Sequence, residues 1–160
     1  MEFTVRDFKS EDFGTLWEID QSCFPPGISY SRHELKSFIR RQRTFTLVAE
    51  RGEGEVENRV LGFLVAEASG RGIGHIITID VRSEARRHHI GSSLLSAAEA
   101  RLRSAKCASV RLETAADNVT AITFYKRHQY YVVGSVPRYY SNGVDALVLE
   151  KDLLSPYSSS

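Results

Sequence analysis

The sequence predicts a single domain of the α/β (α+β) class, built on a central mixed sheet of about six or seven strands. Two observations lead to this fold class. The chain has 160 residues, of which 42% are hydrophobic and 26% charged, as in one ordinary globular domain. Strand-like and helix-like segments follow one another in the order β, α, α, β, β, β, α, β, α, β, β. The domain is expected over residues 1–153, with 154–160 as a flexible tail.

The N-terminal part is expected to hold a strand and two helices. Apolar residues alternate with polar ones over 3–8, which indicates a strand, and recur at helical spacing over 13–19. Proline and glycine at 25–27 end this first helix. Ser31 and Glu34 stand in the S-x-x-E arrangement of a capping box and open a second helix, so the segment between the two helices is a loop.

The middle of the chain is expected to hold three strands. Segments 44–50 and 60–67 are rich in β-forming residues, and the polar sequence RGEGEVEN between them predicts a hairpin. Glycines precede a third strand over His75–Val81. Because side chains alternate along a strand, Ile77, Ile79 and Val81 are expected on one face.

The C-terminal half is expected to hold two helices and three strands. Helical spacing of apolar residues covers 90–106, and 118–128 is also typical of a helix. The segments 109–114, 130–136 and 146–149 have the composition and alternation of strands.

The most informative motif is VRSEARRHHIGSSLL, in which a strand runs through an arginine-rich turn directly into the helix that begins near Ile90. The first N–H groups of a helix have no partner within it, and the helix dipole makes that end positive, so the turn favours an anion such as phosphate. Arg86, Arg87 and His88 add charge, and Gly91 lets the backbone approach the ligand. The alternative is a solvated basic loop whose glycine serves helix packing.

This turn resembles the pyrophosphate loop of the GNAT family of N-acetyltransferases, and the order of elements resembles the family's along nearly the whole chain. Arg86, Ile90 and Gly91 match the family pattern Q/R-x-x-G-x-G/A, whereas His89 stands at its first glycine. The resemblance implies a three-layer domain in which acetyl-CoA, the co-substrate, inserts between splayed strands, and we expect no metal. The residues expected at acetyl-CoA are Ile79, Val81, Arg86, Arg87, His88, His89, Ile90, Gly91, Ser92, Asn118 and Tyr125.

The segment LETAADNVTAITFYKRHQYYVVG carries the second motif. Glu113 stands at a strand end, Asn118 opens a helix five residues later, and Tyr125 lies seven residues further on. In the family this spacing marks a candidate base, an asparagine that contacts the pantetheine arm, and a tyrosine that protonates the leaving thiolate. A phenol suits that step because it stays protonated at neutral pH. Taken singly, Asn118 would be an ordinary N-cap and Tyr125 a core aromatic.

Two residues remain candidates for the base. A carboxylate such as Glu113 has an ordinary pKa of about 4.3 and is a poor base unless burial raises that pKa or a water relays the proton. Imidazole is better matched, and His75 stands where some relatives that act on protein N-termini carry a catalytic tyrosine. The alternative for His75 is a polar residue at a strand edge. The Val81 N–H is expected to polarise the thioester carbonyl.

Two further stretches, CFPPGISYS and RYYSNGVDALVLEKDL, resemble the branch of the family that acetylates protein N-terminal amines, including the ribosomal-protein alanine acetyltransferases. In that branch the two stretches flank a slot for the first residues of a peptide. The resemblance therefore implies a peptide or protein N-terminus as partner, and ribosomal proteins are among the acceptors it implies. Tyrosine hydroxyls can bond a peptide backbone, and a proline-stiffened loop can form an apolar wall. The alternative is a hairpin whose exposed tyrosines suit a strand. The matching residues are Phe24, Pro25, Tyr30, Tyr139 and Tyr140.

Charge and cysteine content count against several other classes. The 21 Lys and Arg against 20 Asp and Glu leave a net charge of +1, which argues against a dedicated nucleic-acid-binding protein. Cys23 and Cys107 lack zinc-site spacing and are expected as free thiols in a reducing compartment. No signal peptide and no membrane-spanning run is recognisable, so a cytoplasmic protein, monomeric or weakly dimeric, is expected.

The resemblance therefore implies transfer of acetyl from acetyl-CoA to a primary amine, with a protein N-terminal α-amine as the favoured acceptor. Direct attack in a ternary complex is expected, on the assumption that neither cysteine lies beside the thioester. Two alternatives remain. One is the same fold acting on a small-molecule amine, which an acidic pocket would favour. The other is a non-catalytic module that binds acyl-CoA or, through Arg82–His89, nucleic acid.

Overall fold

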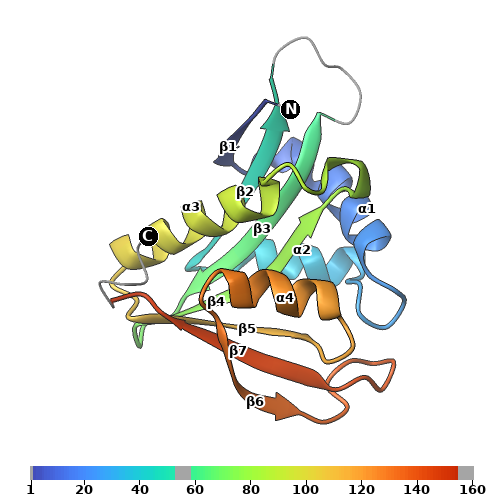
Figure 1. Ribbon diagram of the computed structural model, residues 1–160. Coiled ribbons are helices and arrows are strands. Elements are labelled where there is room, and N and C mark those ends of the chain that lie inside the picture. Colours follow the sequence, from blue (N-terminus) through green and yellow to red (C-terminus); the bar gives the residue numbers. More distant parts are fainter. Residues whose placement is uncertain (1, 53–58, 155–160) are drawn as a thin grey trace.

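A seven-stranded mixed sheet lies between two layers of helices in the computed structural model, which describes residues 2–52 and 59–154 (Figure 1). The strand order is β1-β2-β3-β4-β5-β7-β6, and β4 and β5 form its parallel pair. The strands are β1 (Phe3–Asp7), β2 (Thr44–Arg51), β3 (Val60–Ala68), β4 (Ile73–Val81), β5 (Ser109–Ala115), β6 (Tyr131–Val136) and β7 (Ala146–Asp152). The helices are α1 (Phe13–Cys23), α2 (Arg32–Arg40), α3 (Ile90–Ser104) and α4 (Val119–Arg127).

The fold class and the order of elements expected from the sequence are confirmed. The structure also has two short 3₁₀ helices that the sequence did not predict, at Ser10–Asp12 and Ser83–Ala85. Most of the RGEGEVEN turn and the tail 155–160 lie outside the described residues, so the flexible tail stays a prediction. No helix within 2–52 and 59–154 is both long and apolar enough to cross a membrane.

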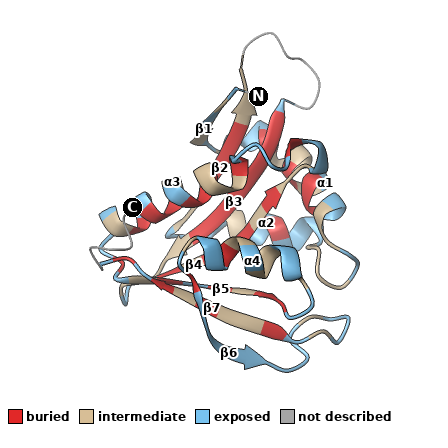
Figure 2. Ribbon diagram, in the orientation of Figure 1, coloured by how far each residue is buried: buried red, intermediate tan, exposed pale blue. Residues whose placement is uncertain are grey.

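The core consists of two apolar clusters, one on each face of the sheet. Helices α3 and α4 cover one face, where Leu94 and Leu102 pack beside the strands. Helices α1 and α2 cover the other, where Leu16 and Leu35 pack with Phe63. Full burial of one such side chain contributes about 1.5–3 kcal/mol. Figure 2 shows burial concentrated in β3 and the inner helix faces, whereas the edge strand β6 is exposed along its whole length.

A bulge in β4 decides which of its side chains face each helix layer. Ile76 pairs with Ala66 and Thr78 with the adjacent Val65, so Ile77 is an extra residue in β4. Ile79 therefore packs in the α3–α4 cluster, as Ile76 does, while Ile77 packs in the α1–α2 cluster. The expectation that Ile77 shares a face with Ile79 and Val81 is wrong, because the extra residue reverses the alternation.

The sheet opens between β4 and β5. These strands pair at only three positions, the last of which joins His75 to Arg111. Beyond this point β4 continues to Val81 along β3, while β5 continues to Ala115 along β7 (Figure 1). The splayed sheet that the family resemblance implied is therefore present, and its apex lies at His75.

Candidate active site

The two candidate bases meet at the apex of the strand opening. His75 is the last residue of β4 that pairs with β5, and its Nε2 lies 2.8 Å from Glu113 Oε1 on β5. The hydroxyl of Tyr139 donates to the same carboxylate oxygen at 3.3 Å. Three residues that the sequence placed in two different roles thus form one hydrogen-bonded group.

Charge and burial act in opposite directions on Glu113. Partial burial alone would raise its pKa, but hydrogen bonds from His75 and Tyr139, together with the charge of Arg111, lower it overall. Glu113 therefore stays a carboxylate at neutral pH and can only accept hydrogen bonds. Burial and the charge of Glu113 raise the pKa of Tyr139, so its phenol remains a donor. This arrangement fixes the ring of His75 by an acceptor at Nε2.

The two stretches assigned to the acceptor slot touch each other. The carbonyl of Gly27, in the α1–α2 loop, accepts from the backbone N–H of Ser141 at 3.2 Å and from its hydroxyl at 2.9 Å. Gly27 has φ +93°, and a Cβ there would lie 2.7 Å from Cβ of Asn142, so the contact requires glycine. The α1–α2 loop and the β6–β7 loop therefore close over the same region.

The predicted slot tyrosines gather in this region. The hydroxyl of Tyr30 donates to the carbonyl of Ile77 at 3.4 Å, and its phenol interacts electrostatically with Tyr139 and Tyr140. The rings of Tyr139 and Tyr140 meet edge to face at 4.9 Å. Burial raises the pKa of Tyr30 and of Tyr140. All three hydroxyls are therefore neutral hydrogen-bonding groups at any working pH.

Phe24 and Pro25 begin the α1–α2 loop. Phe24 is half-buried, and its N–H ends α1 by donating to the carbonyl of Asp20 at 3.2 Å. The carbonyl of Pro25 accepts at 3.1 Å from the N–H groups of Ile28 and Ser29. Pro25 therefore starts a tight turn that gives the loop a defined shape.

Tyr125 lies in α4 and is buried, with edge contacts to the rings of Phe124 at 5.3 Å and Tyr130 at 5.6 Å. Burial raises its pKa far above the ordinary value, and the nearby Asp80 and Tyr140 raise it further. Its hydroxyl is thus protonated throughout the working pH range. The structure combines the two sequence interpretations, because Tyr125 is a core aromatic whose phenol interacts with groups of β4 and of the slot.

The first turn of α3 has the features of an anion site. Its N-cap, His89, makes no side-chain cap, so the N–H groups of Ile90, Gly91 and Ser92 have no intrahelical acceptor. Residues 86–89 are all exposed. A Cβ on Gly91 would lie 3.3 Å from Phe124, so this glycine also serves the close packing of α3 on α4.

His89, which stands at the first glycine of the family pattern, has an unusual backbone conformation. It has φ +63° and ψ +19°, the left-handed conformation that glycine adopts without strain. Histidine is one of the few other residues found there. The position thus has a backbone conformation that suits glycine.

We expect His89→Gly to raise the free energy of unfolding by about 1 kcal/mol, because it relieves the left-handed strain. Acetyl-CoA affinity should be equal or tighter, since the donors are backbone groups. Urea unfolding and calorimetric titration measure the two effects. Ser96→Gly, an exposed position inside α3, is the matched control and should lower stability. A less stable or more weakly binding His89→Gly variant would contradict this account.

Asn118 and Ser92 both make structural contacts within the site region. The side-chain oxygen of Asn118 accepts from the N–H of Ala121 at 3.1 Å and caps α4, a contact that does not use the amide nitrogen. Ser92 Oγ lies 3.0 Å from Nε2 of His128, at the end of α4. Burial lowers the pKa of His128, so its imidazole is neutral at pH 7. The contact between Ser92 and His128 thus joins the start of α3 to the end of α4.

Cys23 corrects one step of the sequence argument. Its Sγ lies 3.4 Å from the carbonyl oxygen of Val81, so a cysteine does lie beside the strand end expected to contact the thioester. Burial raises the pKa of this thiol, which keeps it protonated and a weak nucleophile. Direct attack by the amine stays a prediction, and its argument now rests on the protonation of the thiol and not on its distance. Cys23 and Cys107 are both free.

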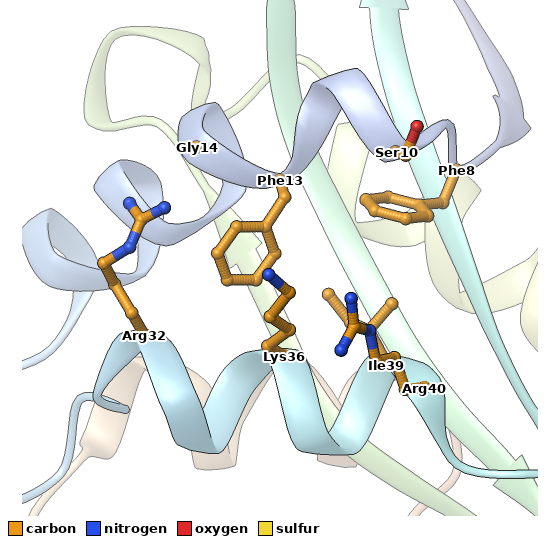
Figure 3. A pocket seen from close by; sticks show the side chains of 8 residues that line it. All are labelled: Phe8, Ser10, Phe13, Gly14, Arg32, Lys36, Ile39 and Arg40. Atoms are coloured by element: carbon orange, nitrogen blue, oxygen red, sulfur yellow. The ribbon is translucent and has the colours of Figure 1, made fainter.

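A surface hollow of about 350 Å³ lies elsewhere, between α1 and α2 (Figure 3). Phe13 forms its floor, with the guanidinium of Arg32 at 5.2 Å and Nζ of Lys36 at 5.6 Å from the ring centroid. No residue predicted for the site lines this hollow. Within 2–52 and 59–154, no three His, Cys, Asp or Glu side chains come together as a metal site requires.

Comparison with known proteins identifies the family and the fold. Residues 13–130 match the model of the Acetyltransferase (GNAT) family. The chain belongs to this family. An uncharacterized N-acetyltransferase of Methanocaldococcus jannaschii is 31% identical over 148 residues, which cover 92% of this chain and 90% of the relative. The protein is accordingly an acetyl-CoA-dependent N-acetyltransferase.

Two further relatives are similar to this GNAT protein. The catalytic subunit of the N-terminal acetyltransferase B complex of Arabidopsis thaliana is 31% identical over 154 residues, 94% of this chain and 85% of the relative. The crystal structure of Ard1 from Thermoplasma volcanium superposes with a TM-score of 0.85 at 27% identity, covering 97% of this chain and all of that one. The fold therefore extends over nearly the whole of each chain.

Sequence reasoning missed a buried acidic pair in this GNAT domain. Asp20 of α1 and Asp80 of β4 are fully buried on the α1–α2 side of the sheet, next to the slot. The signal was present, because an aspartate interrupts the apolar pattern of HIITIDV and another that of LWEID. Charged residues are almost never fully buried unless they are paired.

Proposed function

We propose that the protein transfers acetyl from acetyl-CoA to the α-amine at a protein N-terminus, by direct attack in a ternary complex. The observation that carries the proposal is the group formed by His75, Glu113 and Tyr139 where β4 and β5 separate. Two tyrosine-bearing loops close over this point, as an acceptor that enters through its terminal residues requires.

In this proposal acetyl-CoA lies between β4 and β5. Its diphosphate is bound by the N–H groups of Ile90, Gly91 and Ser92, with charge from the basic turn at 86–89. Ile79 and Val81 supply backbone groups along the free edge of β4, and Asn118 offers its amide to the pantetheine arm. The residues present fit such a ligand, because the helix end lacks a side-chain cap and the strand edge lacks a β5 partner beyond His75.

His75 is proposed as the base and Glu113 as the residue that orients it. Glu113 has a lowered pKa and is thus a weak proton acceptor, but it is suited to hold the imidazole and to stabilise its charged form. Bound acetyl-CoA supplies the thioester. As the amine nitrogen bonds to the carbonyl carbon, His75 takes the proton that nitrogen loses. Tyr125 gives a proton to sulfur as the carbon–sulfur bond breaks, and solvent then restores both residues.

An α-amine fits this machinery better than a lysine side chain. Its pKa of about 8 leaves an appreciable neutral fraction at pH 7, whereas a lysine ε-amine with a pKa near 10.4 is almost wholly charged. A single imidazole is therefore sufficient for the first acceptor. Support comes also from the relative named as an N-terminal acetyltransferase catalytic subunit. The proposal includes ribosomal proteins among the acceptors and a cytoplasmic location for the enzyme.

The proposal is tested with two matched peptides. One has a free α-amine and no lysine, and the other has a blocked N-terminus and one lysine. We expect the first to be acetylated with at least tenfold higher kcat/KM, in line with the difference in neutral amine. Tyr140→Ala should chiefly raise its KM, because this side chain is assigned to the peptide backbone. Tyr139→Ala should also lower kcat, because its hydroxyl donates to Glu113. Faster acetylation of the blocked peptide would overturn the proposed acceptor.

A further inference from the structure

Two buried carboxyl groups beneath the slot have no role in the mechanism above. The residue exposures are 0% for Asp20 and 1% for Asp80, and the two side chains lie within hydrogen-bonding reach of each other. Asp20 Oδ1 and Asp80 Oδ2 receive no hydrogen bond from any other described group. A buried polar atom left without a partner costs about 1–3 kcal/mol.

One proton held between the two side chains satisfies both of these oxygens. Two carboxylates this close cannot both be charged in a buried site, because like charges repel and the interior disfavours charge. Burial, and then the neighbouring Asp20, raise the pKa of Asp80 well above its usual value. Burial also raises the pKa of Asp20. At neutral pH the pair therefore carries one proton and one negative charge.

The groups that act most strongly on the pair offer no alternative to this proton. They are the backbone N–H of Tyr30, the hydroxyl of Thr78 and the like charge of Glu34 on α2, and none of them is a cation. The cation Arg86 acts on the neighbouring thiol of Cys23. Both side chains are in addition buried from water. An ion pair, the usual way to stabilise a buried carboxylate, is thus not the arrangement here.

The other carboxyl oxygen of Asp20 and that of Asp80 connect the two residues to two different parts of the slot. Asp20 Oδ2 accepts from the backbone N–H of Tyr30 at 2.7 Å, at the end of the α1–α2 loop. Asp80 Oδ1 accepts from the hydroxyl of Thr78, directly after the bulge in β4. The side chain of Tyr30 returns to β4 through its bond to the carbonyl of Ile77. A continuous chain of hydrogen bonds thus joins the loop to the bulged strand.

We propose that Asp20 and Asp80 are positioning residues, which share one proton and through it hold the acceptor-binding loop 24–30 against β4. This inference rests on the proposed function in so far as the loop binds the acceptor. The loop has no apolar core of its own, and Pro25 and Pro26 are exposed. Its placement depends on the packing of the Tyr30 ring against the α1–α2 cluster and on hydrogen bonds, among which the bond from the N–H of Tyr30 ends on the buried carboxyl of Asp20.

Two substitutions at one position separate the shared proton from the charge. Asp80→Asn keeps a donor toward Asp20 in the same shape, because the amide N–H replaces the shared proton. Asp80→Ala removes the donor and leaves Asp20 buried without a partner on Oδ1. Glu99→Gln is the control, since it perturbs a buried pair, Glu99 with Lys151 at 2.8 Å, in the cluster on the other face of the sheet.

Hydrogen exchange of the segment 24–30 measures loop placement without any acceptor. We expect exchange to be about tenfold faster or more in Asp80→Ala, because this variant loses one buried charge-assisted hydrogen bond. Exchange should be near wild type in Asp80→Asn and unchanged in Glu99→Gln. The peptide KM should follow the same order, while the acetyl-CoA Kd stays within about twofold in all variants. An infrared carbonyl band of a protonated carboxyl should be present in wild type at neutral pH and absent in Asp80→Asn.

Each result decides a separate part of the inference. Unchanged loop exchange in Asp80→Ala would overturn the positioning role, and equal damage in Asp80→Asn or no protonated-carboxyl band would overturn the shared proton. Faster exchange with an unchanged peptide KM would overturn the connection to the slot. If wild type acetylates no N-terminal peptide, the proposed function fails, while loop exchange and the infrared band still decide the role of the pair.

Discussion

Tyr125→Phe is expected to lower kcat by about a hundredfold or more, because it removes the proton donor for the departing sulfur. Acetyl-CoA Kd should change little, since Phe keeps the ring and its contacts to Phe124 and Tyr130. Single-turnover rates together with calorimetric titration separate the two quantities. A kcat loss with unchanged affinity is the signature of an interaction made in the transition state.

Tyr130→Phe is the matched control for this substitution. Tyr130 is also buried in the same aromatic cluster, but its hydroxyl donates to Glu99 at 2.7 Å on the side of α3. Its loss should lower the free energy of unfolding by about 1–3 kcal/mol, with turnover retained. Full single-turnover activity in Tyr125→Phe would show that the thiolate leaves without this phenol.

His75→Ala is expected to produce the second large loss, again of about a hundredfold in kcat near neutral pH. Without the imidazole, the reaction depends on the fraction of α-amine that is already neutral, so its rate should keep rising with pH up to and beyond about 8. Added imidazole should restore part of the rate. The pH profile and this rescue distinguish a base from a residue that only supports the strand.

The pair of His75 and Glu113 should act as a unit. Glu113→Gln alone should slow the reaction, because Gln can present a donor where His75 needs an acceptor. The double variant should be no slower than His75→Ala alone, since Glu113 acts through His75. Additive losses would assign Glu113 a direct role in proton transfer. That result would favour the carboxylate as base.

Local patterns in the sequence were sufficient to predict most of the fold. The capping box is an example, because Ser31 and Glu34 exchange both expected hydrogen bonds, at 2.9 and 3.1 Å. Such bonds depend on neighbours along the chain. The bulge at Ile77 could not be predicted in this way, since it arises from the register between β3 and β4. One extra residue there turns Asp80 toward α1 and away from α3.

In the site, too, features set by nearby residues could be predicted and contacts between distant segments could not. The spacing of Glu113, Asn118 and Tyr125 along the chain was informative, and the family resemblance directed attention to His75. What the sequence left open was contact between distant segments. The bond between His75 and Glu113 changes how the two candidate bases are interpreted, and Cys23 reaches Val81 from another element. These contacts follow from packing of α1 and β5 around β4, which no local pattern encodes.

The most direct test of the account is a crystal structure of the enzyme with a conjugate that joins an N-terminal peptide to CoA through its α-nitrogen. We expect the diphosphate on the first N–H groups of α3 and the sulfur beside the hydroxyl of Tyr125. The α-nitrogen should lie within reach of His75, directly or through one water, with the peptide under the α1–α2 and β6–β7 loops. A diphosphate bound elsewhere, or a peptide that leaves the β4–β5 opening empty, would contradict the account.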